Sequence, residues 1–310
     1  MITFQLDTKV NIENRVIQYG GPVFTIAEIG VNHNGDYDLA LRTIDAAVDS
    51  GVDAVKFQTF RAEEFMSDKD MIYEYWSREE RVQENMYDMF KRLELPESWH
   101  GKLFEYARTK GVVPLTSVAD VQSVDLVQGL GVGALKLSSE DFINLPLVRH
   151  AASTGLPLIM STGMASEEEF HDVLDILSRA GNSQAVFLHC VSLYPTQDHE
   201  AHLGRIEAIR EETGALVGYS DHTLGIGAAL AATAMGVCLL EKHFTLSRDL
   251  PGPDHGLSSD PHEMATLVAG VRRIEKMLGR KELEPGRREL EIRRMFRRSL
   301  VAVRNLSAGH

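Results

Sequence analysis

Two histidines stand at the ends of consecutive apolar segments of the chain. His222 is the second-to-last residue of "LVGYSDHT" (216–223), and His243 lies near the end of "VCLLEKHFT" (237–245), 21 positions further on. If these segments are neighbouring strands of one sheet, both imidazoles project into one pocket. Two imidazoles with open coordination positions suit a catalytic divalent cation such as Mn²⁺, Co²⁺ or Zn²⁺. The alternative is a pair of hydrogen-bonded core histidines, and the equivalent positions of the two favour the metal.

Two lysines within apolar segments indicate a second ligand. Lys56 and Lys136 each lie in a run of apolar residues, where a charged side chain is costly unless it is paired or used. Ammonium groups and hydroxyls that converge from several strands suit a small phosphorylated anion. One alternative pairs the lysines with Glu28 and Asp141. Another gives one lysine a Schiff base, against which the histidine pair argues. The serines at comparable segment ends are Ser117, Ser139, Ser161 and Ser220.

Two carboxylates, those of Glu28 and Asp254, complete the set of candidate catalytic and binding residues. Glu28 ends the first apolar segment and suits a general acid or base beside the metal. The alternative for Glu28 is a structural partner of a lysine. Arg248 and Asp254 flank a Pro-Gly-Pro stretch in "SRDLPGPDHG". This rigid loop suits a carboxylate held over the pocket for sugar hydroxyls, and the alternative is an ordinary loop.

The elements that must position these residues alternate regularly along the chain. Apolar segments rich in β-branched residues, as expected for parallel strands buried on both faces, are followed by helical patterns. Eight such units predict a closed (βα)8 TIM barrel, in which functional residues gather at the carboxyl ends of the strands. A doubly wound open sheet is the second choice, but its Gly-rich nucleotide turn is absent after the first segment. The predicted strands are residues 23–30, 53–60, 112–118, 134–139, 157–163, 185–191, 216–223 and 237–245.

The remaining sequence divides the chain into three parts. Residues 1–22 are predicted to be an N-terminal extension that contains a hairpin, and residues 23–282 the barrel. Residues 61–96, after the second strand, are predicted to be a charged helical insertion at the active-site end. Residues 283–310 have a different, basic character and are interpreted as a linker and the start of a C-terminal domain. Their last stretch, "RRSLVAVRNLSAGH", is predicted to form a strand and a turn.

Composition excludes several classes of protein. The 310 residues are 44% apolar and 25% charged, with a net charge of −13, which argues against a nucleic-acid or anionic-membrane partner. No apolar run reaches the roughly 18 residues that a membrane span requires. The N-terminus lacks the cationic start and apolar core of a secretion signal. Cys190 and Cys238 lie in apolar runs and are expected to be buried free thiols. A cytoplasmic protein is therefore expected.

Eight motifs are spread along the chain: "IAEIGVNHNGD", "AVKFQTF", "NLPL", "IMSTGM", "LHCVSLYP", "GYSDHTLGIGAAL", "EKHFTL" and "PGPDH". Together they resemble one enzyme family, the sialic acid (nonulosonate) synthases of the NeuB-like branch. The resemblance extends from about residue 22 to 305 and implies a (βα)8 barrel. It also implies an enzyme that condenses phosphoenolpyruvate with an N-acylated amino sugar, typically N-acetylmannosamine. The products would be a nine-carbon 2-keto acid and phosphate, and the cofactor a divalent metal, usually Mn²⁺, with Mg²⁺ or Co²⁺ as alternatives.

The resemblance also implies a role for each matching residue. His222 and His243 would hold the metal, and Glu28 would handle a proton or orient water beside the reacting carbons. Catalysis would depend on these three residues together with the two lysines. The implied phosphoenolpyruvate ligands are Lys56, Ser117, Lys136, Ser139, Ser161, Ser192 and Ser220. The implied sugar ligands are Gln58, Tyr194, Glu241 and Asp254.

The sequence departs from the family pattern at three strand ends. It has "TSVAD" where "STPF" is usual, "SSED" with Asp141 where "GSGE" is usual, and Ser192 where Asn is common. The last two departures fall where substituents of the sugar should lie. They make a 2,4-diacetamido-trideoxy hexose an alternative acceptor to N-acetylmannosamine.

The family usually adds a C-terminal antifreeze-like domain that reaches into the partner's site in a homodimer and supplies an arginine. Residues 297–310 match only the start of that domain. Two other functions compete with the synthase. One is a pyruvate-dependent aldolase on the same barrel, and the other is a barrel that binds ligands without catalysis.

Overall fold

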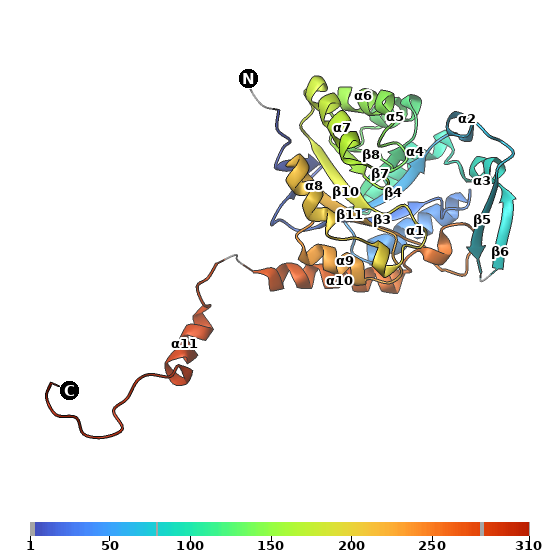
Figure 1. The fold of residues 1–310 in the computed structure, drawn as a ribbon. Helices are drawn as coiled ribbons and strands as arrows, with labels where there is room; N and C mark the ends of the chain where they lie inside the picture. Colours follow the sequence, from blue (N-terminus) through green and yellow to red (C-terminus); the bar gives the residue numbers. More distant parts are fainter. Residues whose placement is uncertain (1–3, 79, 280–281, 310) are drawn as a thin grey trace. The chain divides into compact units, whose positions relative to one another are not determined.

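The computed structural model describes residues 4–78, 80–279 and 282–309. The chain divides into two compact units, Met1–Met277 and Leu278–His310. The larger unit is a closed barrel of eight parallel strands in the order β10-β11-β12-β3-β4-β7-β8-β9 (Figure 1). The predicted TIM barrel and its eight strands are thus confirmed. The strands are β3 (Phe24–Gly30), β4 (Ala54–Thr59), β7 (Val113–Val118), β8 (Leu135–Leu137), β9 (Leu158–Ser161), β10 (Ala185–Cys190), β11 (Leu216–Asp221) and β12 (Leu239–His243).

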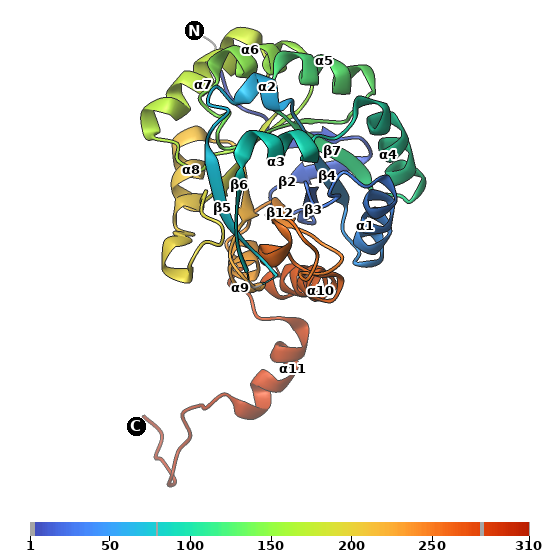
Figure 2. The same ribbon diagram turned by 90° about the vertical axis from the view of Figure 1, so that its right-hand side faces the viewer.

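Helices surround the barrel and follow its strands (Figure 2). Their ends carry the expected signals. In α7, Ser166 and Glu169 form a capping box at the first turn, and Gly181 ends the helix in the left-handed conformation. Within the described residues, no helix combines the length and the apolar character that crossing a bilayer requires. The helices are α1 (Tyr37–Asp49), α4 (Glu97–Thr109), α5 (Val121–Gly129), α6 (Leu145–Ser153), α7 (Glu167–Ala180), α8 (Arg205–Thr213), α9 (Gly227–Ala234) and α10 (Pro261–Leu278).

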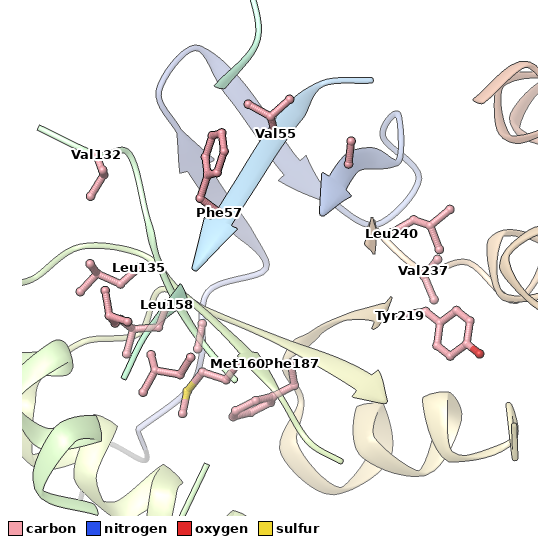
Figure 3. Packing of buried hydrophobic residues seen from close by; sticks show 14 of the residues in the cluster. Val55, Phe57, Val132, Leu135, Leu158, Met160, Phe187, Tyr219, Val237 and Leu240 are labelled. Atoms are coloured by element: carbon pink, nitrogen blue, oxygen red, sulfur yellow. The ribbon is translucent and has the colours of Figure 1, made fainter. Parts of the chain in front are cut away.

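The outer faces of the strands pack against this ring of helices. Phe57, Met160 and Phe187 point away from the barrel axis and belong to a large buried apolar cluster (Figure 3). The inner faces form a second apolar cluster, which includes Phe24 and Leu239. Because both faces are buried, the strands need apolar residues at nearly every position, which explains their near-continuous apolar sequence.

The inner face of each strand changes character along its length. On β3, Phe24 and Ile26 belong to the inner apolar cluster, and Glu28 follows two positions later. On β12, Leu239 is followed by Glu241 and then His243. Alternate residues of a strand share one face, so these series all point inward. The amino-terminal half of the barrel is therefore an apolar core, and the carboxyl-terminal half receives the polar side chains.

A hairpin contributes to the apolar core at the amino-terminal end of the barrel. Strands β1 (Lys9–Ile12) and β2 (Arg15–Gln18) pair antiparallel, in the region where the sequence predicted a hairpin. Val10, Ile12 and Ile17 are at most 1% exposed and belong to the same inner cluster as Phe24. The hairpin thereby gives this end of the barrel an apolar cover.

The insertion between β4 and α4 differs from the prediction. It begins and ends with helices, α2 (Ala62–Phe65) and α3 (Met86–Leu93), but β5 (Ile72–Ser77) and β6 (Glu80–Asn85) form an antiparallel hairpin between them. The prediction of a charged helical insertion is therefore confirmed for its first and last elements and wrong for the two strands between them. Tyr73 and Tyr75 alternate with exposed residues and pack on a small apolar cluster of Val31, Phe60, Met89 and Leu93. That burial favours the extended conformation over a helix.

The hairpin of this insertion lies across one end of the barrel (Figure 2). Its tip contacts the loop after β12, which is on another side of the barrel from β4. The backbone amide of Gly252 donates to Ser77 Oγ at 3.2 Å, and Arg78 Nε donates to the carbonyl oxygen of Asp249 at 2.7 Å. The insertion is thus held where it joins the barrel and again at the tip of its hairpin.

The smaller unit contains one helix, α11 (Arg287–Phe296), among its described residues 282–309. The strand predicted at the end of the chain is absent from residues 297–309, so that prediction was wrong. A strand must pair its backbone groups with a neighbouring strand, and none lies in this unit's described part. The interpretation of residues 283–310 as the start of a further domain stays a prediction, as does the boundary at residue 282.

We expect Gly218→Ala to destabilise the barrel by about 1–3 kcal/mol, because strands β10 and β12 leave no room for a methyl group. A Cβ at Gly218 would lie 2.5 Å from Leu188 Cδ2 and 2.6 Å from the carbonyl oxygen of Leu239. Urea unfolding measures the change. Gly227→Ala is the control, since nothing lies within 4 Å of its Cβ and the site is helical. Equal stability of the two variants would contradict the expectation.

Candidate active site

The polar inner residues meet in a pocket at the carboxyl ends of the barrel strands. The pocket contains about 800 Å³ of space, part of it open to solvent. It is lined by residues of every barrel strand or of the loops that follow them. The lining residues that the sequence predicted are Glu28, Lys56, Gln58, Ser117, Lys136, Ser139, Ser161, Tyr194, Ser220, His222, Glu241 and His243.

Two predicted ligands do not line this pocket. Asp254 lies next to it, with Oδ2 3.7 Å from His243 Nδ1. Ser192 lies next to Gly163, where an added methyl group would clash with both Ser192 Oγ and Ser139 Oγ. The contact of Ser192 with phosphoenolpyruvate stays a prediction.

The two histidines come from adjacent strands and face each other. Their ring centroids are 5.4 Å apart, and the ring of Tyr194 lies 4.2 Å from that of His222. His222 Nδ1 lies 2.7 Å from the carbonyl oxygen of Val191 and so carries the hydrogen, which leaves the Nε2 lone pair for a ligand. Burial, with the nearby His222, holds the pKa of His243 well below its usual range. His243 is therefore a neutral imidazole, the form that binds metals.

Buried charges of opposite sign lie at the base of the pocket. Lys56 Nζ is 2.7 Å from Glu28 Oε2 and 3.8 Å from Glu241 Oε2. Lys136 Nζ is 3.9 Å from Glu241 Oε1. All four side chains are at most 6% exposed. The pairing of a lysine with Glu28 is thus present, but none of the ion pairs of the described residues joins a lysine to Asp141.

Burial and charge move the pKa values of these groups in different directions. Burial raises the pKa of Glu28 to about 7, against the attraction of Lys56. Burial also raises the pKa of Asp254 to about 6 and lowers that of Lys136. For Glu241, the attraction of both lysines outweighs burial, and its pKa is lowered. Of Glu28, Asp254 and Glu241, Glu28 is therefore the carboxyl group whose pKa lies nearest to neutral pH, which suits proton exchange.

Hydroxyl and amide groups orient the charged side chains. Lys136 Nζ donates to Ser161 Oγ at 2.7 Å, and Ser220 Oγ donates to Glu241 Oε1 at 3.0 Å. Gln58 Nε2 donates to Glu28 Oε1 at 3.0 Å. The serines and the glutamine thus belong to one hydrogen-bonded layer with the lysines.

The sequence did not identify several lining residues. Phe60 and Phe90 form an edge-to-face pair with centroids 5.5 Å apart. Phe90 comes from α3 of the insertion, where no sequence signal indicates a pocket. Cys190 was predicted only as a buried thiol, which is confirmed. Its place two positions after Leu188 on an inward-facing series would have indicated the pocket, where Sγ lies 3.8 Å from His222 Nδ1.

One group elsewhere has the composition of a metal site. Glu167, His171 and Glu212 offer ligand atoms within 4.8 Å of one another, but all three residues are exposed. His171 Nε2 lies 2.7 Å from Glu212 Oε1, and this hydrogen bond accounts for the arrangement. The buried histidine pair remains the better candidate for a catalytic ion.

Sequence comparisons place the chain among known proteins. A family model described as the NeuB family matches residues 43–283. The chain is 43% identical to the N,N'-diacetyllegionaminic acid synthase of Legionella pneumophila, over 92% of this chain and 82% of that protein. It is 32% identical to the pseudaminic acid synthase of Helicobacter pylori, over 93% of this chain and 85% of that protein.

Solved structures agree with these matches. The N-acetylneuraminic acid synthetase of Leptospira borgpetersenii superposes with a TM-score of 0.84 and is 34% identical, covering 95% of this chain and 99% of that one. A truncated 3-deoxy-D-arabino-heptulosonate 7-phosphate synthase from Thermotoga maritima has a TM-score of 0.68 at 17% identity, over 88% of this chain and 94% of that one. The second likeness concerns the fold alone.

The raised pKa of Glu28 predicts how Glu28→Gln changes stability with pH. In the folded protein the pKa is about 7, above the 4.5 of an ordinary glutamate. Glu28 therefore lowers the stability of the wild type progressively as pH rises from about 4.5 to 7, and the glutamine variant lacks this contribution. We expect the unfolding free energy of Glu28→Gln to gain on that of the wild type by up to roughly 3 kcal/mol over this range.

Urea unfolding at pH 4.5 and pH 7.5 measures this difference. Glu211→Gln, on an exposed part of α8, controls for the change in net charge. A difference between Glu28→Gln and wild type that stays constant with pH would contradict the assignment of the pKa.

Proposed function

The chain belongs to the NeuB family, and from this premise we propose that it is a nonulosonic acid synthase. It condenses phosphoenolpyruvate with an N-acylated amino sugar to a nine-carbon 2-keto acid and releases phosphate. One observation carries the proposal: two buried histidines, of which His243 is held neutral, share a pocket with two buried lysines. The first pair suits the activation of an aldehyde, and the second suits a phosphorylated anion.

Phosphoenolpyruvate binds at the base of the pocket. Lys56 and Lys136 supply the positive charge, and the hydroxyls of Ser139, Ser161 and Ser220 complete the hydrogen bonds. Glu28 titrates near neutral pH, so its protonation on binding leaves Lys56 free to pair with the anion. Ser117 lines the same side and stands opposite Lys136 in the strand register, which agrees with a further contact.

The residues present fit a divalent metal. His222 Nε2 and the neutral imidazole of His243 would hold it, and the buried His243 Nδ1 has no hydrogen-bond partner among the residues that the structure describes. Imidazole ligands suit Mn²⁺ or Co²⁺, and Mn²⁺ is proposed, with Mg²⁺ as a further alternative. When bound, the ion would supply Lewis-acid polarisation of the sugar aldehyde.

The chain's own residues position the reactants and move protons. C3 of the enol forms a bond to the aldehyde carbon, water adds to C2, and the C2–O bond to phosphate breaks. Glu28 lies beside Lys56; once protonated it gives its proton to the aldehyde oxygen as the carbon–carbon bond forms, and as the carboxylate it then accepts a proton from the attacking water. Gln58 holds Glu28 Oε1 and fixes the direction of the carboxyl group. Tyr194, Glu241 and Asp254 contact the sugar.

The lining of the pocket favours one kind of acceptor. Phe60 and Phe90 form an apolar wall with Val118 and Ala119. Phe60 follows Gln58 by two positions and so lies on the sugar side of β4. An apolar wall suits the C6 methyl and second acetamido group of a 2,4-diacetamido-trideoxy hexose better than the hydroxyls of N-acetylmannosamine. We propose the diacetamido sugar as the acceptor.

A pyruvate-dependent aldolase is the second candidate. Burial lowers the pKa of Lys136, and a lysine of lowered pKa suits a Schiff base. Borohydride treatment in the presence of pyruvate distinguishes the two functions. Covalent trapping on Lys136 would support the aldolase, and its absence together with phosphate release supports the synthase.

The primary test is phosphate release. The protein is incubated with phosphoenolpyruvate, Mn²⁺ and, separately, N-acetylmannosamine and the two diacetamido-trideoxy sugars, with and without a chelator. We expect release that is sensitive to the chelator and fastest with one diacetamido sugar. Saturable phosphoenolpyruvate binding without release from any sugar would overturn the proposal that this chain is a complete synthase. The homodimer remains a prediction, which light scattering checks.

We expect His222→Ala to abolish metal-dependent turnover, because it removes the nitrogen ligand that the Val191 carbonyl orients. Binding of phosphoenolpyruvate should remain near the wild-type level, since the lysines are unchanged. Turnover is measured by phosphate release and binding by calorimetry. Normal turnover of His222→Ala without added metal would refute the metal assignment.

We expect Phe90→Ser to lower kcat/KM for the diacetamido sugar at least about tenfold, because an apolar contact with a methyl group is worth about 1–3 kcal/mol. The value for N-acetylmannosamine should change little. Phe90→Leu keeps an apolar side chain and is the matched control. A parallel loss with both sugars would contradict a role in selecting the acceptor.

A further inference from the structure

A buried ion pair lies directly behind the two histidines, outside the pocket. Lys242 Nζ is 2.8 Å from Asp221 Oδ2, and the two side chains are 3% and 0% exposed. Each residue immediately precedes one of the histidines in the sequence. Alternate residues of a strand point to opposite faces, so the ion pair occupies the outer face and the imidazoles the inner face.

The polar groups around this pair are satisfied by the residues on either side of His222. Asp221 Oδ1 accepts hydrogen bonds from the Tyr219 hydroxyl at 3.1 Å, the Thr223 amide at 2.9 Å and the Thr223 hydroxyl at 2.8 Å. Lys242 Nζ donates a second bond to the carbonyl oxygen of Thr223 at 2.8 Å. One ammonium group therefore binds the chain both before and after His222.

The same contact fixes the pairing of the two strands. Asp221 stands opposite Lys242 in the parallel register of β11 and β12. A shift by one residue would exchange the faces of the side chains and turn a histidine away from the pocket. Asp221 and Lys242 would then each be left buried without an opposite charge, which is strongly destabilising. The pair thus opposes such a shift where the histidines need the correct register.

Energetics indicate that stability alone does not explain the pair. A buried ion pair contributes little compared with well-packed apolar residues of the same volume. The pair instead specifies one register of β11 and β12, because each buried charge is compensated only when it lies opposite the other. The imidazole of His222 is further fixed by its contact with the Val191 carbonyl at 2.7 Å.

We propose that Asp221 and Lys242 are positioning residues that hold the two imidazoles at the separation a divalent cation needs. The inference rests on the proposed metal site and goes beyond it, because neither residue lines the pocket. Residues on the outer face of the barrel would thus contribute to the affinity of the inner site for the metal. Outer partners of metal ligands typically contribute 10–100-fold to affinity.

The test compares Mn²⁺ binding by calorimetry, with MnCl₂ alone as the probe. In the double variant Asp221→Leu/Lys242→Met, apolar side chains replace the pair, so folding should be retained. We expect a near-wild-type melting temperature, unchanged phosphoenolpyruvate binding and a Kd for Mn²⁺ raised about 10–100-fold. The single variant Lys242→Arg retains a cation beside Asp221, so its affinity for Mn²⁺ should lie between that of the wild type and that of the double variant.

A matched control breaks an ion pair at the other end of the barrel. Arg272 Nη2 lies 2.7 Å from Asp53 Oδ2, near the amino-terminal end of β4. Asp53→Asn should reduce stability without changing the Kd for Mn²⁺. If the double variant does not fold, Asp221→Asn provides the same comparison, since it removes the charge and keeps an acceptor.

The outcomes separate the two proposals. Wild-type Mn²⁺ affinity in the folded double variant would overturn the positioning role and leave the metal site intact. Failure of the wild type to bind Mn²⁺ would overturn the metal site of the proposed function, and the positioning role with it. Weaker Mn²⁺ binding in Asp53→Asn as well would show that loss of stability alone explains the effect, which also overturns the positioning role.

Discussion

The site depends on the contact of Lys56 with two carboxylates at the base of the pocket. Lys56 lies 2.7 Å from Glu28 and 3.8 Å from Glu241, and all three side chains are buried. Charges can be kept there only because they compensate one another. The three come from neighbouring strands, so closure of the barrel between β12 and β3 creates the contact. The buried charges of the active site therefore compensate one another only when the barrel is closed.

Most of this arrangement could be predicted from the sequence, because the direction of each side chain on a strand follows a simple alternation. Alternate residues face inward, and the inward series becomes polar toward the carboxyl end, as from Ile26 to Glu28. That rule brings His222 and His243 together although they are far apart in the chain. It could not place Ser192, which belongs to a loop, where alternation does not decide direction. Phe90 was missed because only tertiary packing brings α3 to the pocket.

The two wrong predictions have a shared physical cause. Residues 61–96 contain many charged residues that favour helices, yet tyrosines at alternate positions of β5 gain burial and pair with β6. Residues 297–309 contain the apolar run Leu300–Val303 but no strand to pair with among the described residues of their unit. In both regions a partner decides the conformation, and a single sequence does not show which partner is present.

The hairpin at the amino-terminal end of the barrel also constrains how the molecule can assemble. Val10 and Ile12 share a buried cluster with residues of both early and late strands, such as Phe24 and Leu239. The Tyr19 hydroxyl donates to the Ala215 carbonyl at 2.7 Å. The contacts of the hairpin are thus complete only when a strand 196 residues further along the chain is in place. Contacts of such long sequence separation slow folding, and the apolar strands stay exposed to other chains until the barrel closes.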